Sequence, residues 1–428
     1  MKNNLTSPKR RILSAMLAAL LLLLTATLPL LLTSCGDMGS DVTTLYVYNW
    51  GEYISDGSED TLDVNAMFED WYFETYGERV KVNYSTYSSN ESMYAKISSG
   101  ASNYDVIVPS DYMIERLINE EGGSLLAPLD YDNIPNAKNI LPKFQNAAYD
   151  PDNNGDGYND YSVPYLYGMI GIIYNTTMVP QNEPDIGSWA LMWDSDYAGN
   201  ILQFNNSRDA FGSAQYAMGD VNLVNSDNED DWRAALELLK EQKPILQGYV
   251  MDEIYNKMEN GSAAIAAYYA GDYLAMYENN DSLEFYYPSE GTNLYMDAMC
   301  IPAASKNKVI AERYINFMLS EEAAVANAEY TYYASPNRLV VESEEYIEYM
   351  GEIKDDAYEK MYDTDSVATS SYQNLSGDKL LLINSLWEEL KSDVTVSAGI
   401  YVICGVIVGV LLSLVIFFAI RRKRRNIY

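Results

Sequence analysis

Apolar and polar positions alternate where the folded part of the chain begins. Residues 45–48 follow the period-two pattern of a half-buried strand, which breaks at Asn49-Trp50-Gly51, where glycine permits a tight turn. The next apolar residues follow the spacing i, i+3, i+4, i+7 of an amphipathic helix: Val64, Met67, Phe68 and Trp71. Residues 80–84 alternate again. The order strand, helix, strand predicts the start of a parallel sheet in an α/β domain.

The rest of the chain continues this alternation of strands and helices. The apolar runs predict strands at 105–108, 201–204, 263–269 and 293–302, and helices at 311–328 and 378–391. Tyrosine, serine and acidic residues lie at or just beyond the ends of these strands, and ligands of open α/β sheets bind beyond the carboxyl ends of strands. Aromatic faces beside carboxylates suit an organic cation, although Trp50 and Tyr53 alone fit ordinary core packing equally well.

The first segment of the chain has the pattern of an export signal. Basic residues are followed by an apolar run over residues 12–32 and then by Leu-Thr-Ser-Cys, which resembles the bacterial lipobox. The resemblance implies that residues 1–35 are a lipoprotein signal peptide, that Cys35 carries lipid, and that residues 36–44 form a tether. An uncleaved signal anchor is the alternative, and both place the body outside the cell.

The last segment of the chain has the pattern of a membrane span. Residues 397–420 contain no charged side chain over 24 positions, enough to cross a bilayer core of about 30 Å. The basic run within residues 421–428 follows directly and predicts a short cytoplasmic tail.

Composition narrows the functional classes. The chain has 28 basic residues, 62 acidic residues and no histidine, so a histidine base and histidine-built zinc sites are excluded. The net charge of -34 argues against nucleic acid as a partner, since phosphate binding requires clustered lysine and arginine. The three cysteines are far apart in the chain and indicate no disulfide framework.

Six stretches of the chain form a further pattern: LYVYNWGEYI, STYSSNESMYAK, YDVIVPSDY, YSVPYLYG, EGTNLYMDAMCIP and YYASPN. Together, and in this order, they resemble the spermidine/putrescine-binding proteins of bacterial polyamine ABC transporters. The resemblance covers residues 45–391 and implies an α/β type II periplasmic-binding-protein fold with two lobes and a central cleft. Lobe 1 would comprise residues 45–163 and 293–345, and lobe 2 residues 164–292 and 346–392.

The same resemblance implies a ligand site, residue by residue. Its aromatic and hydroxyl positions are Trp50, Tyr53, Ser110, Tyr112, Tyr269, Tyr295 and Tyr333, and its acidic and amide positions are Glu52, Asp209, Asp297 and Gln373. Carboxylates would pair with ammonium groups while aromatic rings contact the methylene chain. The site departs from the family pattern in having Asn206 where aspartate is common, which leaves the choice between spermidine and putrescine open.

An acidic loop lies between two of these motifs. Residues 152–160 read DxNxDGxxD and resemble an EF-hand-type calcium loop. The oxygen ligands would be Asp152, Asn154, Asp156, Asp160 and the carbonyl of Tyr158. The bidentate glutamate of such loops is absent, because position twelve is Val163. A solvated turn is the alternative.

The sequence therefore predicts a binding protein, not an enzyme. It would capture an extracellular polyamine and deliver it to the permease subunits of an ABC importer, without a required cofactor. The alternatives are a binding protein for another small cationic solute and a membrane-anchored polyamine sensor.

Overall fold

The computed structural model describes residues 42–58, 61–100 and 103–392. Contacts between residues divide the chain into two compact units, one ending at Thr44 and including Glu69–Lys81, the other containing Leu45–Phe68 and the chain from Val82 onward. In the described part of the smaller unit, Lys81 forms a salt bridge with Glu69 and Arg79 lies over the ring of Phe73. The site described below belongs to the larger unit, whereas β1, β2 and α2 have residues in both units.

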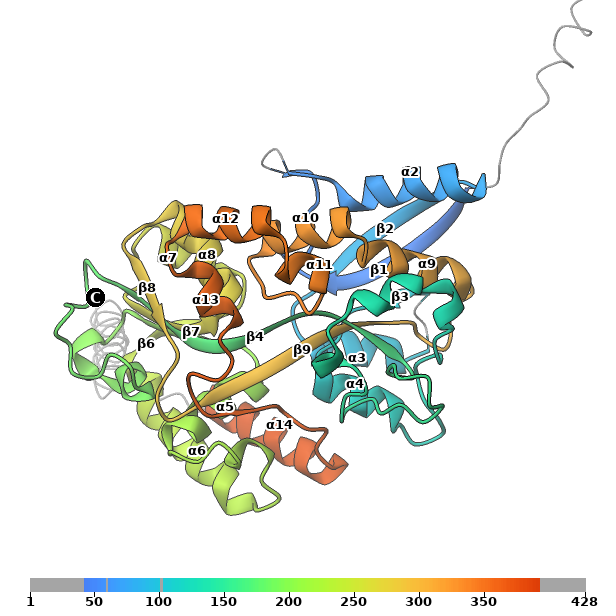
Figure 1. The fold of residues 1–428 in the computed structure, drawn as a ribbon. Coiled ribbons are helices and arrows are strands. Elements are labelled where there is room, and N and C mark those ends of the chain that lie inside the picture. The colour runs from blue at the N-terminus through green and yellow to red at the C-terminus, as the bar shows by residue number, and fades with distance from the viewer. Residues whose placement is uncertain (1–41, 59–60, 101–102, 393–428) are drawn as a thin grey trace, which may run out of the picture. The chain divides into compact units, whose positions relative to one another are not determined.

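A mixed sheet organises the fold (Figure 1). Its strands follow one another in the order β2-β1-β3-β9-β4-β7-β5-β6, with β10 paired to β9 and β8 paired to β4. Their bounds are β1 Thr43–Trp50, β2 Val80–Tyr87, β3 Val106–Ile107, β4 Ser162–Asn175, β5 Ile201–Phe204, β6 Leu246–Val250, β7 Ile265–Tyr269, β8 Leu283–Tyr286, β9 Thr292–Cys300 and β10 Thr369–Ser370. The predicted strand, helix, strand order at the start of the body and the predicted β5 are confirmed.

Two long antiparallel strands hold the middle of the sheet. β4 pairs with β9 over residues 162–169 and with β7 over residues 170–174. Almost every residue of β4 is buried, which its nearly continuous apolar sequence explains. Tyr295 and Asp297 lie within β9, which is antiparallel to both β3 and β4. The expectation that the ends of the predicted strands meet at one edge is wrong, because β5, β7 and β9 run antiparallel to β1 and β3.

The α-helices are α2 Val64–Tyr76, α3 Asn90–Ser98, α4 Asp111–Ile118, α5 Ser207–Ala217, α6 Glu229–Gln242, α7 Glu253–Glu259, α8 Ala270–Asn279, α9 Lys308–Met318, α10 Glu321–Thr331, α11 Arg338–Val341, α12 Glu344–Ile353, α13 Ala357–Tyr362 and α14 Gly377–Ser392. Short 3-10 turns occur at η2 Tyr131–Asn133, η3 Pro135–Asn139, η4 Pro142–Phe144, η5 Trp189–Trp193, η6 Ser195–Tyr197, η7 Leu223–Asn225 and η8 Lys243–Ile245. The predicted helix over 311–328 is two helices, because Ser320 adopts the extended backbone of a helix cap and α10 restarts after it.

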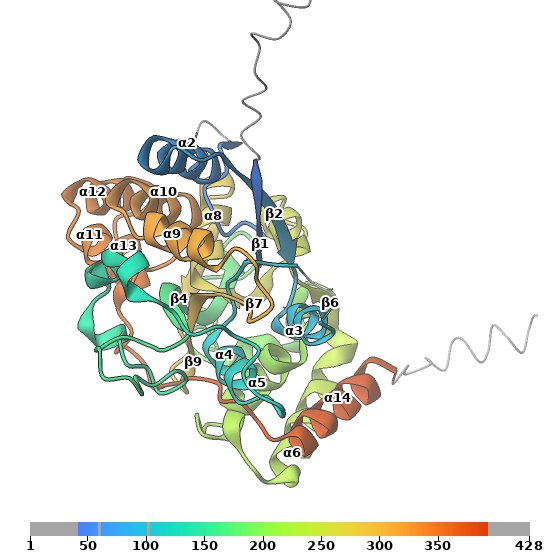
Figure 2. The same ribbon diagram turned by 90° about the vertical axis from the view of Figure 1, so that its right-hand side faces the viewer.

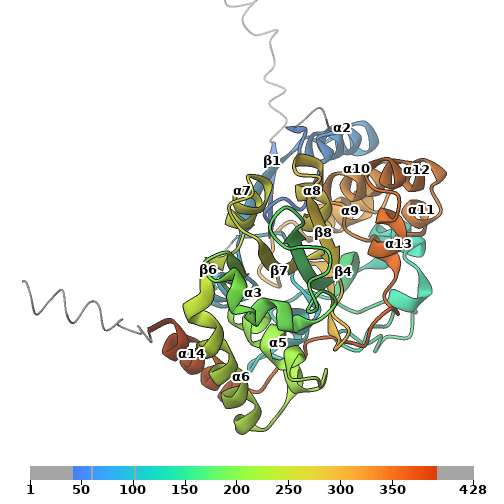
Figure 3. The ribbon, with the colours of Figure 1, turned by 90° about the vertical axis from the view of Figure 1, so that its left-hand side faces the viewer.

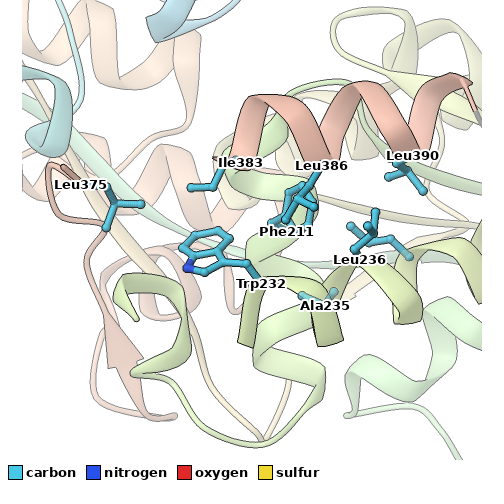
Figure 4. Packing of buried hydrophobic residues seen from close by; sticks show 10 residues of the cluster. Phe211, Trp232, Ala235, Leu236, Leu375, Ile383, Leu386 and Leu390 are labelled. Carbon is cyan, nitrogen blue, oxygen red and sulfur yellow. The ribbon is translucent and has the colours of Figure 1, made fainter. Parts of the chain in front are cut away.

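The last described helix packs firmly onto the body. α14 lies beside α6, as two further views agree (Figure 2; Figure 3). Leu386 and Leu390 of α14 meet Phe211 of α5 and Trp232 and Leu236 of α6 in one buried cluster (Figure 4). These apolar contacts fix the end of the described chain against α5, whose first turn contributes to the site.

The predicted terminal segments lie outside the described residues. This applies to the signal peptide 1–35 with Cys35, to most of the tether 36–44, to the membrane span 397–420 and to the tail 421–428. Within residues 42–58, 61–100 and 103–392, no helix has the length and apolar character needed to cross a membrane.

Candidate functional site

A cavity collects side chains from both halves of the sheet. Of the predicted ligand residues it is lined by Trp50, Glu52, Tyr53, Ser110, Tyr112, Asp209, Tyr269, Tyr295, Asp297 and Tyr333. Gln373 is not among the lining residues: it is exposed, whereas its neighbour Tyr372 is buried and lines the cavity.

Asp297 is the first acidic centre of the cavity. Its carboxylate is 5% exposed and accepts hydrogen bonds from Ser110 Oγ at 2.6 Å and from the Tyr53 hydroxyl at 2.8 Å. Burial raises the pKa of Asp297 to about 6, against the opposing effect of these two donors. Ser110 also accepts from Asn90 Nδ2 at 3.0 Å, so the donor that faces Asp297 is itself held in place. A largely ionised carboxylate at pH 7, without a cationic partner in the cavity lining, is ready to accept an ammonium group.

Asp209 is the second acidic centre. It lies in the first turn of α5, where Asn206 caps the helix by accepting from the Asp209 backbone N–H at 2.8 Å. The Asp209 carboxylate accepts from the Tyr269 hydroxyl at 2.6 Å and from Asn206 Nδ2 at 2.7 Å. Burial raises the pKa of Asp209, and these hydrogen bonds oppose the rise. Asn206 therefore orients the Asp209 carboxylate, whereas an aspartate at position 206 would add a second carboxylate beside it.

Asp272 is a third centre, which the sequence did not single out. It belongs to the first turn of α8, where an acidic residue has an ordinary explanation in the helix dipole. Its carboxylate accepts from the hydroxyls of Tyr333, at 2.6 Å, and of Tyr255. Burial raises its pKa to about 6. The ring of Tyr333 passes so close to Gly271 that a side chain there would collide with it, with a Cβ only 2.3 Å from the ring.

Two more acids lie near Ser110 and were also missed. Asp111 begins α4, is buried, and accepts the Tyr112 backbone N–H at 2.7 Å. Burial raises the pKa of Asp111 to about 8, so it carries a proton at pH 7. Glu91 accepts from the Tyr112 hydroxyl at 2.9 Å, and burial raises its pKa as well. Both acids line the cavity.

Residues 45–53, at the end of β1 and just beyond it, contribute one aromatic wall and one exposed acid to the cavity. The Trp50 indole N–H donates to the Val108 carbonyl at 2.9 Å, which fixes the half-buried ring at the cavity. Glu52 has a positive φ of 49° and is exposed, and its carboxylate accepts from the Tyr330 hydroxyl at 3.2 Å. Glu52 is therefore less desolvated than the three buried acidic centres.

Aromatic rings fill the space between the acidic centres. Tyr53 meets Tyr333 edge to face with ring centroids 5.0 Å apart, and Tyr269 meets Tyr295 in the same way at 5.5 Å. Asn293 adds a polar group that was also missed: it lines the cavity, is 3% exposed, and its Oδ1 finds no donor among the described residues. The lining thus offers hydrogen-bond acceptors and π faces.

The charge of the lining has one sign. Seven carboxyl groups line the cavity, from Glu52, Glu91, Asp111, Asp209, Asp252, Asp272 and Asp297, and no lysine or arginine of the described chain is among the lining residues. Buried carboxylates are ordinarily paired with cations, because an unpaired buried charge is costly. A cavity that holds its acids with tyrosine, serine and asparagine donors instead leaves the cationic partner to be supplied by a ligand.

The acidic loop at 152–160 lies apart from this cavity. Asp152 accepts from the backbone N–H groups of Gly155 and Gly157, Asn154 accepts from that of Asp156, and Asp160 accepts from Asn153. Within this fully described loop, no three acid side chains have oxygens within 4.8 Å of one another.

Comparison with known proteins agrees with this geometry. The profile of the bacterial extracellular solute-binding protein family matches residues 66–357, more than half of the chain. The chain belongs to this family. A spermidine/putrescine-binding periplasmic protein of Salmonella typhimurium is 30% identical over 357 residues, which is 82% of this chain and 93% of that protein.

Solved structures give the same result for the fold of this solute-binding protein. A spermidine/putrescine ABC transporter protein of Listeria monocytogenes has a TM-score of 0.69 and 33% identity, covering 82% of this chain and 99% of that one. A spermidine/putrescine ABC transporter substrate-binding protein of Streptococcus pneumoniae, solved in complex with calcium and HEPES, has a TM-score of 0.62 and 31% identity, covering 82% and 98%. The predicted α/β periplasmic-binding-protein fold and the family are therefore confirmed.

Proposed function

We propose that this solute-binding protein captures a polyamine in the cavity and delivers it to the permease subunits of an ABC importer. The observation that carries the proposal is the pairing of Asp209, Asp272 and Asp297 with neutral donors only, in a cavity walled by tyrosine rings. Separate acidic centres joined by apolar rings match a chain of ammonium groups joined by methylene spacers. The relatives bear the names of spermidine- and putrescine-binding proteins, which supports the same ligand class here.

Calorimetric titration of residues 37–392 with putrescine, spermidine, arginine and choline tests this function. We expect heat and saturable one-to-one binding with at least one of the two polyamines, and no saturable binding of arginine or choline. Absence of binding by both polyamines would refute the proposal. Preferential binding of choline would favour the alternative of another small cationic solute.

We further propose that two lobes, residues 45–163 with 293–345 and residues 164–292 with 346–392, close around the ligand. The long strands β4 and β9 support this division, because β4 pairs with β9 along one part of its length and with β7 along the other. Closure would desolvate the ammonium groups and strengthen their pairing with the carboxylates. A decrease in the radius of gyration on adding ligand, measured by small-angle X-ray scattering, is the expected result, and an unchanged radius at saturation would contradict closure.

We also propose that the loop 152–160 binds calcium. Carboxylate and amide oxygens at positions one, three and five, and two loop N–H groups that orient Asp152, support an EF-hand-like arrangement. The Streptococcus pneumoniae relative, solved with calcium, adds support. We expect calcium to raise the melting temperature of the wild type but not of the double variant Asp152→Asn, Asp156→Asn. Equal behaviour of both proteins would refute a calcium site here.

We finally propose lipid attachment at Cys35 and a membrane span at residues 397–420, which would hold the protein at the outer face of the cell membrane. The lipobox-like sequence and the uncharged span followed by basic residues support both anchors. Labelling of cells with an alkyne fatty acid should mark the wild type but not Cys35→Ala. Truncation after residue 392 in the Cys35→Ala background should release the protein from the membrane fraction.

A further inference from the structure

Arg208 is a buried cation directly behind the cavity. It lies in the first turn of α5, beside Asp209, and is 5% exposed. Its guanidinium donates to the Val224 carbonyl at 3.2 Å and to Asn225 Oδ1 at 3.4 Å, while its Nε has no acceptor. Over the described residues, no carboxylate oxygen forms a salt bridge with it. Burying a guanidinium without an ion pair is costly, so the folded state needs another interaction that offsets this cost.

The guanidinium is held by the aromatic wall of the cavity. Its Cζ lies 4.4 Å from the ring centroid of Tyr372 and 5.5 Å from that of Tyr112. Both rings line the cavity, whereas Arg208 itself does not. The guanidinium also lies 5.7 Å from the ring centroid of Trp232. Arg208 is therefore separated from the cavity by one layer of aromatic side chains that themselves attract cations.

The positive charge acts through this layer on the cavity acids. It lowers the pKa of Glu91, Asp111 and Asp209, in each case against a larger rise caused by burial. The charge of Arg208 thus favours the ionised form of all three acids without a direct ion pair to any of them. In the empty cavity it offsets part of the surplus negative charge.

We infer that Arg208 is a fixed internal cation that limits the number of positive charges the cavity accepts from a ligand. The inference rests on the proposed polyamine-binding function. A ligand ammonium on the Asp209 side of the cavity is repelled by Arg208, and the repulsion grows with the number of ligand charges. The residue would therefore discriminate against triamines and tetramines relative to the diamine putrescine.

Arg208 also has a positioning role that the test must separate from its charge. Asn225 Oδ1 accepts from Arg208 and, at 2.9 Å, from the backbone N–H of Gln373, while Asn225 Nδ2 donates to the Ser371 carbonyl at 2.8 Å. Loss of Arg208 therefore loosens the segment that presents Tyr372. Such loosening should weaken binding of every ligand alike, whereas loss of charge should change the ratio between ligands.

The test measures the dissociation constants of putrescine, spermidine and spermine for the full-length chain, purified in detergent, at low ionic strength. Two variants alter Arg208: Arg208→Gln removes the charge, and Arg208→Lys keeps it. For Arg208→Gln we expect the affinity ratio of spermidine to putrescine to rise about fivefold over the wild type, since one repulsive charge has been removed. For Arg208→Lys we expect both affinities to fall and the ratio to stay within twofold.

If Arg208→Gln does not fold, Arg208→Met removes the same charge with an apolar side chain and should raise the ratio in the same way. Asn225→Ala is the control for loosening: it loosens the same segment without removing charge, so its ratio should stay within twofold of the wild type, and a larger change would overturn the inference. An unchanged ratio in folded Arg208→Gln would overturn it too, with polyamine binding itself still standing. No polyamine binding by the wild-type chain would instead overturn the proposed function together with this inference.

Discussion

Replacing Asp297 by asparagine separates the ligand's requirement for charge from the fold's requirement for a polar group. The substitution keeps the shape of the side chain, and Ser110 Oγ and the Tyr53 hydroxyl remain within reach as partners of an amide. A ligand ammonium loses a desolvated ionic partner, which costs about 2–5 kcal/mol. At about 1.4 kcal/mol per factor of ten, we expect polyamine affinity at pH 7.5 to fall about 30-fold or more.

The empty protein should respond in the opposite direction. Burial raises the pKa of Asp297 from 3.8 to about 6, so the ionised group destabilises the folded state at pH values above 6. A shift of about two units corresponds to about 3 kcal/mol. We therefore expect Asp297→Asn to raise the free energy of unfolding of the empty protein at pH 8, by up to about 3 kcal/mol. Higher stability with weaker binding is the signature of a group that is kept for its ligand.

The assay combines titration calorimetry with urea unfolding of the ligand-free protein, and Asp105→Asn serves as the matched control. Asp105 is equally buried but lies outside the cavity lining, where it accepts from the Tyr46 backbone N–H at 3.0 Å and from Ser305 Oγ at 2.7 Å. The control should lose about 1–3 kcal/mol of stability and keep its polyamine affinity. Affinity of Asp297→Asn within threefold of the wild type would refute the assignment of Asp297 as a ligand partner.

Three further predictions follow from the same cavity. Asp272→Asn should weaken polyamine binding tenfold or more, as measured by calorimetry. Tyr333→Phe removes only one hydrogen bond to Asp272, so it should reduce the binding free energy by only about 0.5–1.5 kcal/mol in the same assay. Because the pKa values of Asp272 and Asp297 are about 6, affinity should decrease as pH falls from 7.5 to 5, and equal affinity at both values would contradict ionic recognition. Because burial raises the pKa of Asp111 to about 8, the ligand-free protein should gain stability as pH falls from 9 to 7, and Asp111→Asn should reduce that gain in thermal melts.

The local pattern of apolar residues was enough to predict elements with a continuous apolar run or a helical apolar spacing. The strand at Ile201–Phe204 is found with its predicted bounds, and the predicted helix between the first two strands is Val64–Tyr76. The single helix expected over 311–328 failed because a serine within an apolar-rich stretch interrupts the periodicity too weakly to be noticed. The antiparallel direction of β9 could not be predicted, because strand direction depends on pairing between residues far apart in the chain.

The candidate site was predicted unevenly for a similar reason. Ten of the eleven ligand positions that the family resemblance implied line the cavity, and at the eleventh Gln373 is exposed while its neighbour Tyr372 is buried. Asp272 was missed because an acid in the first turn of a helix has a sufficient local explanation. Only the fold shows that the hydroxyls of Tyr255 and Tyr333 converge on its carboxylate.

The tyrosines explain how an acidic cavity can exist before its ligand arrives. A lysine or arginine paired directly with Asp209 or Asp297 would stabilise the carboxylate, but it would also occupy the position that a ligand ammonium needs. A phenolic hydroxyl donates one hydrogen bond and leaves the remaining acceptor sites of the carboxylate free. The Tyr269 side chain both holds a carboxylate and forms part of the aromatic wall: its hydroxyl donates to Asp209 at 2.6 Å and its ring packs against Tyr295. The buried Arg208 is placed behind the rings and not among the carboxylates, which lets it offset their charge without blocking the ligand.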